Sequence, residues 1–154
     1  MKRQSATSSP PEPVFFSDEN LGRRVFPERL RAAGVRLEIH LDHFDQGAED
    51  RDWLREVGKR GWVLLTLDAR LRYNRLERDA IMEHGLAAFI VAGGQRHAEK
   101  AEIFLRARNR VLRFLRKHRA PFIAKIYAGG KVELWLDKET DAARQRSLGR
   151  RGLP

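Results

Sequence analysis

The segment that decides the fold is residues 62–68, WVLLTLD, an almost continuous apolar run that ends in a carboxylate. A strand with one face in water alternates apolar and polar residues, whereas an unbroken apolar run is typical of a strand covered on both faces. Strands of that kind occur in parallel sheets with helices on both sides. The segment therefore predicts an α/β protein.

Neighbouring segments repeat this pattern of strands and helices. Apolar runs predict further strands, and apolar residues at helical spacing predict helices between them. The expected strands are residues 14–17, 35–40 and 86–94, and the expected helices are residues 21–33, 50–59, 75–84 and 97–118. Residues 122–136 are expected to form a hairpin that turns at Gly129 and Gly130. The prediction is a three-layer α/β/α sandwich with a mainly parallel sheet and a C-terminal β-hairpin.

The length of 154 residues suits one domain. Residues 1–13, MKRQSATSSPPEP, predict a disordered leader because they are rich in Ser, Pro and charge. We expect residues 14–137 to form a single domain and residues 138–154 to form a basic, flexible tail. The sequence has no cysteine and no long apolar run, so we expect a soluble, cytoplasmic protein without a membrane partner. Any metal ligands must then be oxygen or imidazole groups.

Charge favours a polyanionic partner. The chain has 31 Lys and Arg residues against 21 Asp and Glu residues, a net charge of +10, and 24 of the 31 are arginines. The planar guanidinium group binds phosphate in a bidentate way, which makes nucleic acid the favoured partner. A solvated surface laced with ion pairs, or a groove for an acidic protein, would give the same composition.

Carboxylates follow two of the expected strands. Asp18 comes after the first strand, in VFFSDENLGRR, and Asp68 comes after the third. Asp50 begins the helix that leads into the third strand. In a parallel sheet these positions lie at the same edge, so three carboxylates from distant segments should converge there. Their repulsion would be relieved by a divalent cation, and oxygen ligands favour Mg²⁺ or Mn²⁺.

Each acid also has a structural interpretation. Asp18 or Glu19 could cap the helix that follows, and Asp68 could cap a short turn. Asp50 is a good N-cap residue, in which case Asp52 would be the ligand. The five histidines have no metal-binding spacing, and we expect them on the surface or in the core.

Three stretches, in the order FFSDENLGRR, GAEDRDWL and GWVLLTLDARLR, resemble the PIN-like superfamily. They are most similar to its compact branch, which is related to the VapC-type toxins of bacterial toxin–antitoxin systems. The resemblance covers residues 14–94. It implies a Mg²⁺- or Mn²⁺-dependent endoribonuclease, the toxin of a type II pair, with RNA as substrate and an antitoxin protein as partner. Asp18, Asp50 and Asp68 match the acidic ligands of the family.

The resemblance also implies further site residues. Glu77 is a candidate fourth carboxylate, and Glu19 is another candidate ligand. The candidate RNA contacts that it implies follow Asp68; they are Arg70, Arg72 and Arg75. Apart from the resemblance, the outward arginine face of the long helix offers Arg106, Arg110 and Arg113 as contacts with the RNA backbone. One ion or two, and a monomer or a homodimer, stay open.

Two other functions compete with the nuclease. The first is a PIN-like module that has lost catalysis and binds nucleic acid through its basic surface. The second is a signalling receiver domain, with Asp68 as phosphoacceptor and Lys125 on a late strand. A receiver requires Ser or Thr at the end of its fourth strand, and AAFIVAGG has neither.

Overall fold

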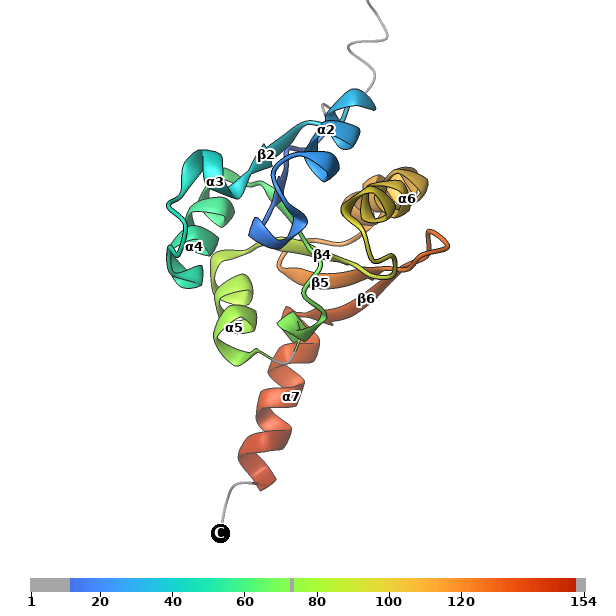
Figure 1. The fold of residues 1–154 in the computed structure, drawn as a ribbon. Coiled ribbons are helices and arrows are strands. Elements are labelled where there is room, and N and C mark those ends of the chain that lie inside the picture. The colour runs from blue at the N-terminus through green and yellow to red at the C-terminus, as the bar shows by residue number, and fades with distance from the viewer. Residues whose placement is uncertain (1–11, 73, 152–154) are drawn as a thin grey trace, which may run out of the picture.

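The computed structural model describes residues 12–72 and 74–151, so the expected leader lies almost wholly outside the described residues. Within them, six strands form one sheet in the order β2-β1-β3-β4-β5-β6. Strands β1 to β5 are parallel, and β6 is antiparallel to β5. The strands are β1 (Phe15–Ser17), β2 (Leu37–Ile39), β3 (Val63–Thr66), β4 (Ala87–Val91), β5 (Phe122–Ile126) and β6 (Val132–Asp137). The predicted α/β fold with a mainly parallel sheet and a hairpin is confirmed (Figure 1).

Helices cover both faces of the sheet, as the unbroken apolar strands require. Side chains alternate between the faces along each strand, so Phe15 and Phe16 are both buried but belong to different core clusters. The cluster of Phe15 includes residues of α2 (Val25–Ala32) and α6 (His97–Lys117), and that of Phe16 includes residues of α4 (Asp50–Arg60) and α5 (Arg75–His84). The sheet is therefore the middle layer of three.

The strand order reverses at β1, which lies between β2 and β3. Ser17 at the end of β1 pairs with Ile39 of β2 and with Leu65 of β3. The three strands consequently end at one edge, where side chains that follow them come together. Ligands of open α/β sheets bind at such a reversal, outside the carboxyl ends of the strands.

The segment after β1 differs from the expected continuous helix over residues 21–33. A short 3-10 turn, η1 (Glu19–Leu21), comes first, and α2 begins only at Val25. Gly22 interrupts the helical path with a φ of 79°, and a Cβ atom there would lie 2.8 Å from the ring of His97. The sequence pattern also did not predict α3 (His40–His43), which directly follows β2.

The segment expected to be a flexible tail contains α7 (Lys138–Arg151), which extends away from the sheet (Figure 1). Asp137 and Thr140 cap its start: the Thr140 N–H donates to Asp137 Oδ1 at 2.8 Å, and the Asp137 N–H donates to Thr140 Oγ1 at 2.9 Å. This reciprocal pair satisfies backbone groups that a helix start leaves unpaired, which favours a helix where composition alone suggested none.

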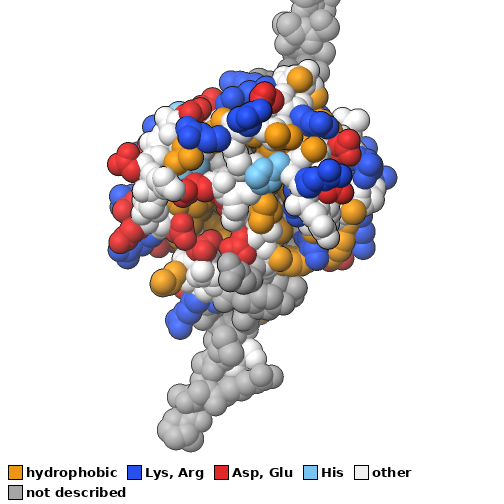
Figure 2. Space-filling view, in the orientation of Figure 1, with side chains coloured by type: hydrophobic (Ala, Val, Ile, Leu, Met, Phe, Trp, Pro, Cys, Tyr) orange, Lys and Arg blue, Asp and Glu red, His pale blue; other side chains and the backbone are white. Residues whose placement is uncertain are grey.

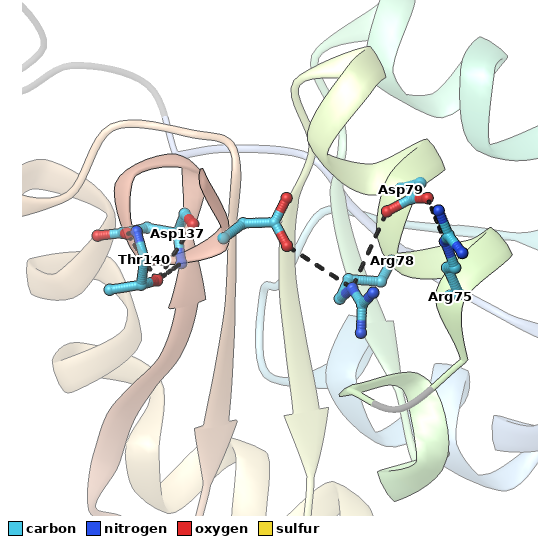
Figure 3. A network of polar contacts seen from close by, with 6 residues as sticks. Arg75, Arg78, Asp79, Asp137 and Thr140 are labelled. Carbon is cyan, nitrogen blue, oxygen red and sulfur yellow. Dashed lines mark hydrogen bonds and ion pairs between the residues drawn. The ribbon is translucent and has the colours of Figure 1, made fainter. Parts of the chain in front are cut away.

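An ion pair joins α7 to α5. Arg78 is buried, and its Nε lies 3.7 Å from Asp141. Figure 3 shows Arg78 beside Asp79, which in turn faces Arg75, and the cap formed by Asp137 and Thr140. The domain boundaries stay a prediction. Among the described helices, none combines the length and apolar character needed to span a bilayer.

Candidate active site

A pocket of about 250 Å³ opens at the sheet edge where β1 and β3 end. Its walls come from the ends of these two strands, the start of α4, the start of α5 and the residue after β2. The described residues that line it are Asp18, Glu19, Asn20, His40, Asp50, Trp53, Asp68 and Glu77. Figure 2 shows acidic side chains gathered near the centre of one face of the molecule, with Lys and Arg side chains around the periphery.

Asp18 is held in place from both sides. Its carboxylate accepts a hydrogen bond from the backbone N–H of Asn20 at 3.1 Å, and the Thr66 hydroxyl also donates to it. Thr66 Oγ1 in turn accepts from the backbone N–H of Asp68 at 3.1 Å. This single buried hydroxyl therefore fixes the ends of β1 and β3 relative to each other. Asp18 also caps η1, so the structural interpretation of this residue holds beside its place in the pocket.

Burial raises the pKa of Asp18 to about 7, against the lowering effect of its bonds with Thr66 and Asn20. The nearby charges of Asp68 and Asp50 raise this pKa further. Among the described residues, none supplies a cationic neighbour that would offset the cost of removing this carboxylate from water. Negative charge therefore gathers in the pocket, and at Asp18 no cationic side chain among the described residues neutralises it.

Asp50 and Glu77 meet across the pocket. They share a hydrogen bond, which requires a proton on one of the two carboxyl groups. Burial, and then the charge of Asp50, raises the pKa of Glu77 to about 7. Trp53 Nε1 donates to Asp50 Oδ1 at 3.0 Å, and Asn74 Nδ2 donates to Glu77 Oε1 at 2.8 Å. Both carboxyl groups are therefore oriented by residues of their own helices.

Asp50 lines the pocket and Asp52 does not. The N-cap of α4 is Glu49 and the helix begins at Asp50, so the alternative in which Asp50 caps this helix is wrong. Asp52 is exposed and lies 3.7 Å from Arg55, outside the pocket. Asp50 is thus the acid of α4 that faces Asp18 and Glu77.

Sequence reasoning missed His40 as a pocket residue. Its side chain is 1% exposed, and among the described residues neither Nδ1 nor Nε2 has a hydrogen-bond partner. Burial lowers its pKa, although Glu19 and Asp50 act in the opposite direction. The signal that could have found it is its position directly after the second strand, which matches the positions of Asp18 and Asp68.

Of the candidate RNA contacts whose side chains the structure describes, none lines this pocket. Arg75 is exposed at the start of α5, 3.6 Å from Asp79, and the side chains of Arg70 and Arg72 lie outside the described part of the chain.

The arginines of α6 lie elsewhere. Arg106 Nη1 donates to the carbonyl oxygen of Ala128 at 2.6 Å, beside the turn of the β5–β6 hairpin. Arg110 and Arg113 line a separate pocket with Lys117 and His118. Among the described residues, this pocket shares no lining residue with the acidic one. Arg110 and Arg113 therefore line a pocket distinct from the acidic one.

The donor set fits a divalent cation. Oxygen ligands from Asp18, Asp50, Asp68 and Glu77 surround one pocket, and burial together with the neighbouring carboxylates raises the pKa of Asp18 and of Glu77. In the described part of the chain, however, no group of three or more His, Asp or Glu side chains is arranged to hold an ion as it stands. Bonds to Trp53 and Asn74 account for the present orientation of two of the acids.

Comparison with known proteins bears on the family of this chain. The family described as PIN like domain matches residues 13–93. A protein of Mycobacterium tuberculosis described as "Putative ribonuclease VapC45" is 32% identical over 81 residues, which make up 50% of this chain and 59% of that relative. The match therefore spans under two thirds of the relative's length. No solved structure matches the chain.

The receiver alternative is not supported. Lys125, the basic residue that such a domain would use, instead places its Nζ 4.7 Å from the ring of Tyr127 and 4.8 Å from that of Trp135. The family match covers the strands, helices and acids that form the pocket. This chain belongs to the PIN-like domain family.

Proposed function

We propose that this protein is a divalent-metal-dependent endoribonuclease, acting in the cytoplasm as the toxin of a type II toxin–antitoxin pair. The observation that carries the proposal is the convergence of four carboxyl groups from separate segments in one pocket, two of them with a pKa raised to about 7. Burying this much negative charge lowers the stability of the fold, so the cluster of carboxyl groups needs a functional explanation. Binding a cation and a phosphodiester is such an explanation.

Each pocket residue has a part in this proposal. Asp18, Asp50, Asp68 and Glu77 would hold Mg²⁺ or Mn²⁺, which activates water and offsets negative charge on the phosphodiester. Thr66 keeps the ends of β1 and β3 in register through its bonds to Asp18 and to the backbone of Asp68. Because the pKa values of Asp18 and Glu77 are near 7, cation binding should release protons and weaken below neutral pH.

RNA binding would rest on the arginines. A net charge of +10 attracts a polyanion to a protein whose pocket is acidic, and a bound cation would let the backbone approach the carboxylates. We assign Arg75, with Arg70 and Arg72, to the phosphates next to the pocket. Arg106, Arg110 and Arg113 would hold RNA farther away, on the surface beside the hairpin.

An antitoxin is the proposed partner protein. The name of the Mycobacterium tuberculosis relative and the acidic pocket both support this assignment. An Arg or Lys side chain inserted by the partner would pair with the carboxylates and compete with the cation. Co-purification with the product of the neighbouring gene tests the proposal. If no complex forms and expression of the protein alone does not slow growth, a role in routine RNA processing becomes the better account.

The activity itself is tested by cleavage of a mixed RNA pool with and without Mg²⁺ or Mn²⁺. The wild type should cleave only with the cation, and Asp18→Asn should not cleave. Asp52→Asn is the matched control because it removes an exposed carboxylate of α4 outside the pocket; it should keep its activity. A wild type that binds RNA but does not cleave it with either cation would instead support the binding module.

A further inference from the structure

His40 occupies a costly position for a polar side chain. Its ring lies among aromatic rings, with centroids 5.2 Å from Trp53, 5.4 Å from Phe44 and 6.1 Å from Phe16. Neither ring nitrogen forms a hydrogen bond among the described residues, and the side chain is 1% exposed. Leaving a buried polar group unpaired costs about 1–3 kcal/mol. An apolar residue would fill this space without that cost, so the imidazole needs a further explanation.

The backbone places this imidazole at the same level of the sheet as Asp18. Ser17 of β1 pairs with Ile39 of β2, and the next residue in each strand is Asp18 or His40. Thr66 ends β3 and is followed within two residues by Asp68. Each of the three strands that end at the pocket therefore contributes one potential ligand, and the ligand after β2 is a nitrogen.

The pocket side of the ring faces a carboxylate. His40 Nε2 lies 3.8 Å from Glu19 Oε1, too far for a hydrogen bond. Two ligand atoms that each lie about 2.1–2.2 Å from one ion cannot be more than about 4.3 Å apart. The separation of these two atoms, 3.8 Å, falls inside this limit, so the distance between them is compatible with binding to the same cation.

We propose that His40 is a nitrogen ligand of the divalent cation in this pocket, together with Glu19, and that it makes the site select Mn²⁺ over Mg²⁺. The inference rests on the proposed function in taking a cation to bind among these carboxylates. Imidazole binds first-row transition metals well, whereas Mg²⁺ prefers oxygen and gives up its waters reluctantly. A site of carboxylates alone would lack this source of selectivity.

The direct test is pulsed electron paramagnetic resonance of the full chain loaded with Mn²⁺. A coordinated imidazole gives a ¹⁴N coupling to the Mn²⁺ electron spin, and labelling the histidines with ¹⁵N replaces it by a ¹⁵N coupling. The wild type should show this coupling. The experiment needs no substitution, so it stands even if a variant of this buried residue fails to fold.

Two variants assign the coupling to one histidine. His40→Gln should lose it, whereas His43→Gln should keep it, because His43 lies outside the pocket with Nε2 2.6 Å from Glu38 Oε1. Calorimetry with the metals alone should show that His40→Gln weakens Mn²⁺ binding by about tenfold or more and Mg²⁺ binding by less than about threefold. Circular dichroism checks that both variants are folded.

The outcomes separate this inference from the proposed function. If Mn²⁺ binds to the wild type without nitrogen coupling, or if His40→Gln lowers both affinities equally, His40 is not the selective ligand and the carboxylate site stands without it. If neither cation binds the wild type at millimolar concentration, the metal-dependent nuclease fails as well.

Discussion

Asp18→Asn is expected to stabilise the protein at pH 8 in the absence of divalent cations. In the folded chain the pKa of Asp18 is about 7, against an ordinary value of 3.8. Since the folded state binds this proton more tightly than the unfolded chain does, the contribution of Asp18 to stability is greatest below pH 3.8. It is lost progressively as the pH rises to about 7 and beyond. Asparagine carries no charge and avoids that loss.

The size of the effect follows from the change in pKa. A rise of about three in pKa corresponds to about 4 kcal/mol, at about 1.36 kcal/mol for each factor of ten in the proton equilibrium. Asparagine also gives up part of the bonding of the carboxylate with Asn20 and Thr66, which costs about 1–3 kcal/mol. The expected net gain at pH 8 is therefore about 1–3 kcal/mol. Near pH 4 the penalty for the charge is almost absent, so only the cost of the lost bonds remains and Asp18→Asn should be the less stable protein.

Urea unfolding followed by tryptophan fluorescence measures this difference, with a chelator present, at pH values from 4 to 8. Asp42→Asn serves as a control that removes an exposed carboxylate outside the pocket. Millimolar Mn²⁺ should stabilise the wild type more than Asp18→Asn. If Asp18→Asn were no more stable than the wild type at pH 8, the carboxylate would not be penalised by burial, and the electrostatic argument for the site would be refuted.

Three further predictions follow from the same geometry. Asp141→Ala should lower the free energy of unfolding by about 1–3 kcal/mol in urea titrations, because buried Arg78 loses one of its ionic partners; an unchanged value would show that α7 is not held by this pair. Mn²⁺ affinity should rise between pH 6 and pH 8 as Glu77 loses its proton, whereas Glu77→Gln should flatten that rise in calorimetry. Arg75→Ala and, separately, Arg110→Ala should weaken RNA binding for all sequences, and each should reduce the slope of log K against log salt by about 0.7; a binding constant insensitive to salt would contradict phosphate contacts.

Local patterns in the sequence were sufficient for most of the fold. The apolar run over residues 62–68 predicted a strand covered on both faces, and β3 is such a strand, buried along its whole length. The C-terminal hairpin and the helix over residues 75–84 also follow from local signals, because turn residues and apolar spacing act over a few residues. Local patterns did not predict α7, whose residues were expected to form a flexible tail. The reciprocal cap and the ion pair with α5 support this helix although it has few apolar residues.

Sequence reasoning placed Asp18 and Asp68 in the candidate site because they follow strands, and Asp50 because it begins a helix at the same edge of the sheet. Asp18 and Asp68 come straight after apolar runs, so the parallel topology was enough to bring them to one edge. The choice between Asp50 and Asp52 could not be made in the same way. It depends on the exact residue at which α4 starts, since one step along a helix turns a side chain by about 100°.

His40 shows what only the tertiary structure decided. Its sequence neighbourhood contains no metal-binding motif, and its pairing partner in the sheet, β1, lies more than twenty residues earlier in the chain. The register between Ser17 and Ile39 sets the ring beside Glu19, and packing of Trp53 and Phe44 around it keeps its nitrogens from water. The sequence by itself determined which segments form strands and which acids follow them. The burial of His40 and the burial that raises the pKa of Asp18 arise only when distant segments pack together. The loss of water around a group depends on all the atoms that surround it, whichever part of the chain they come from.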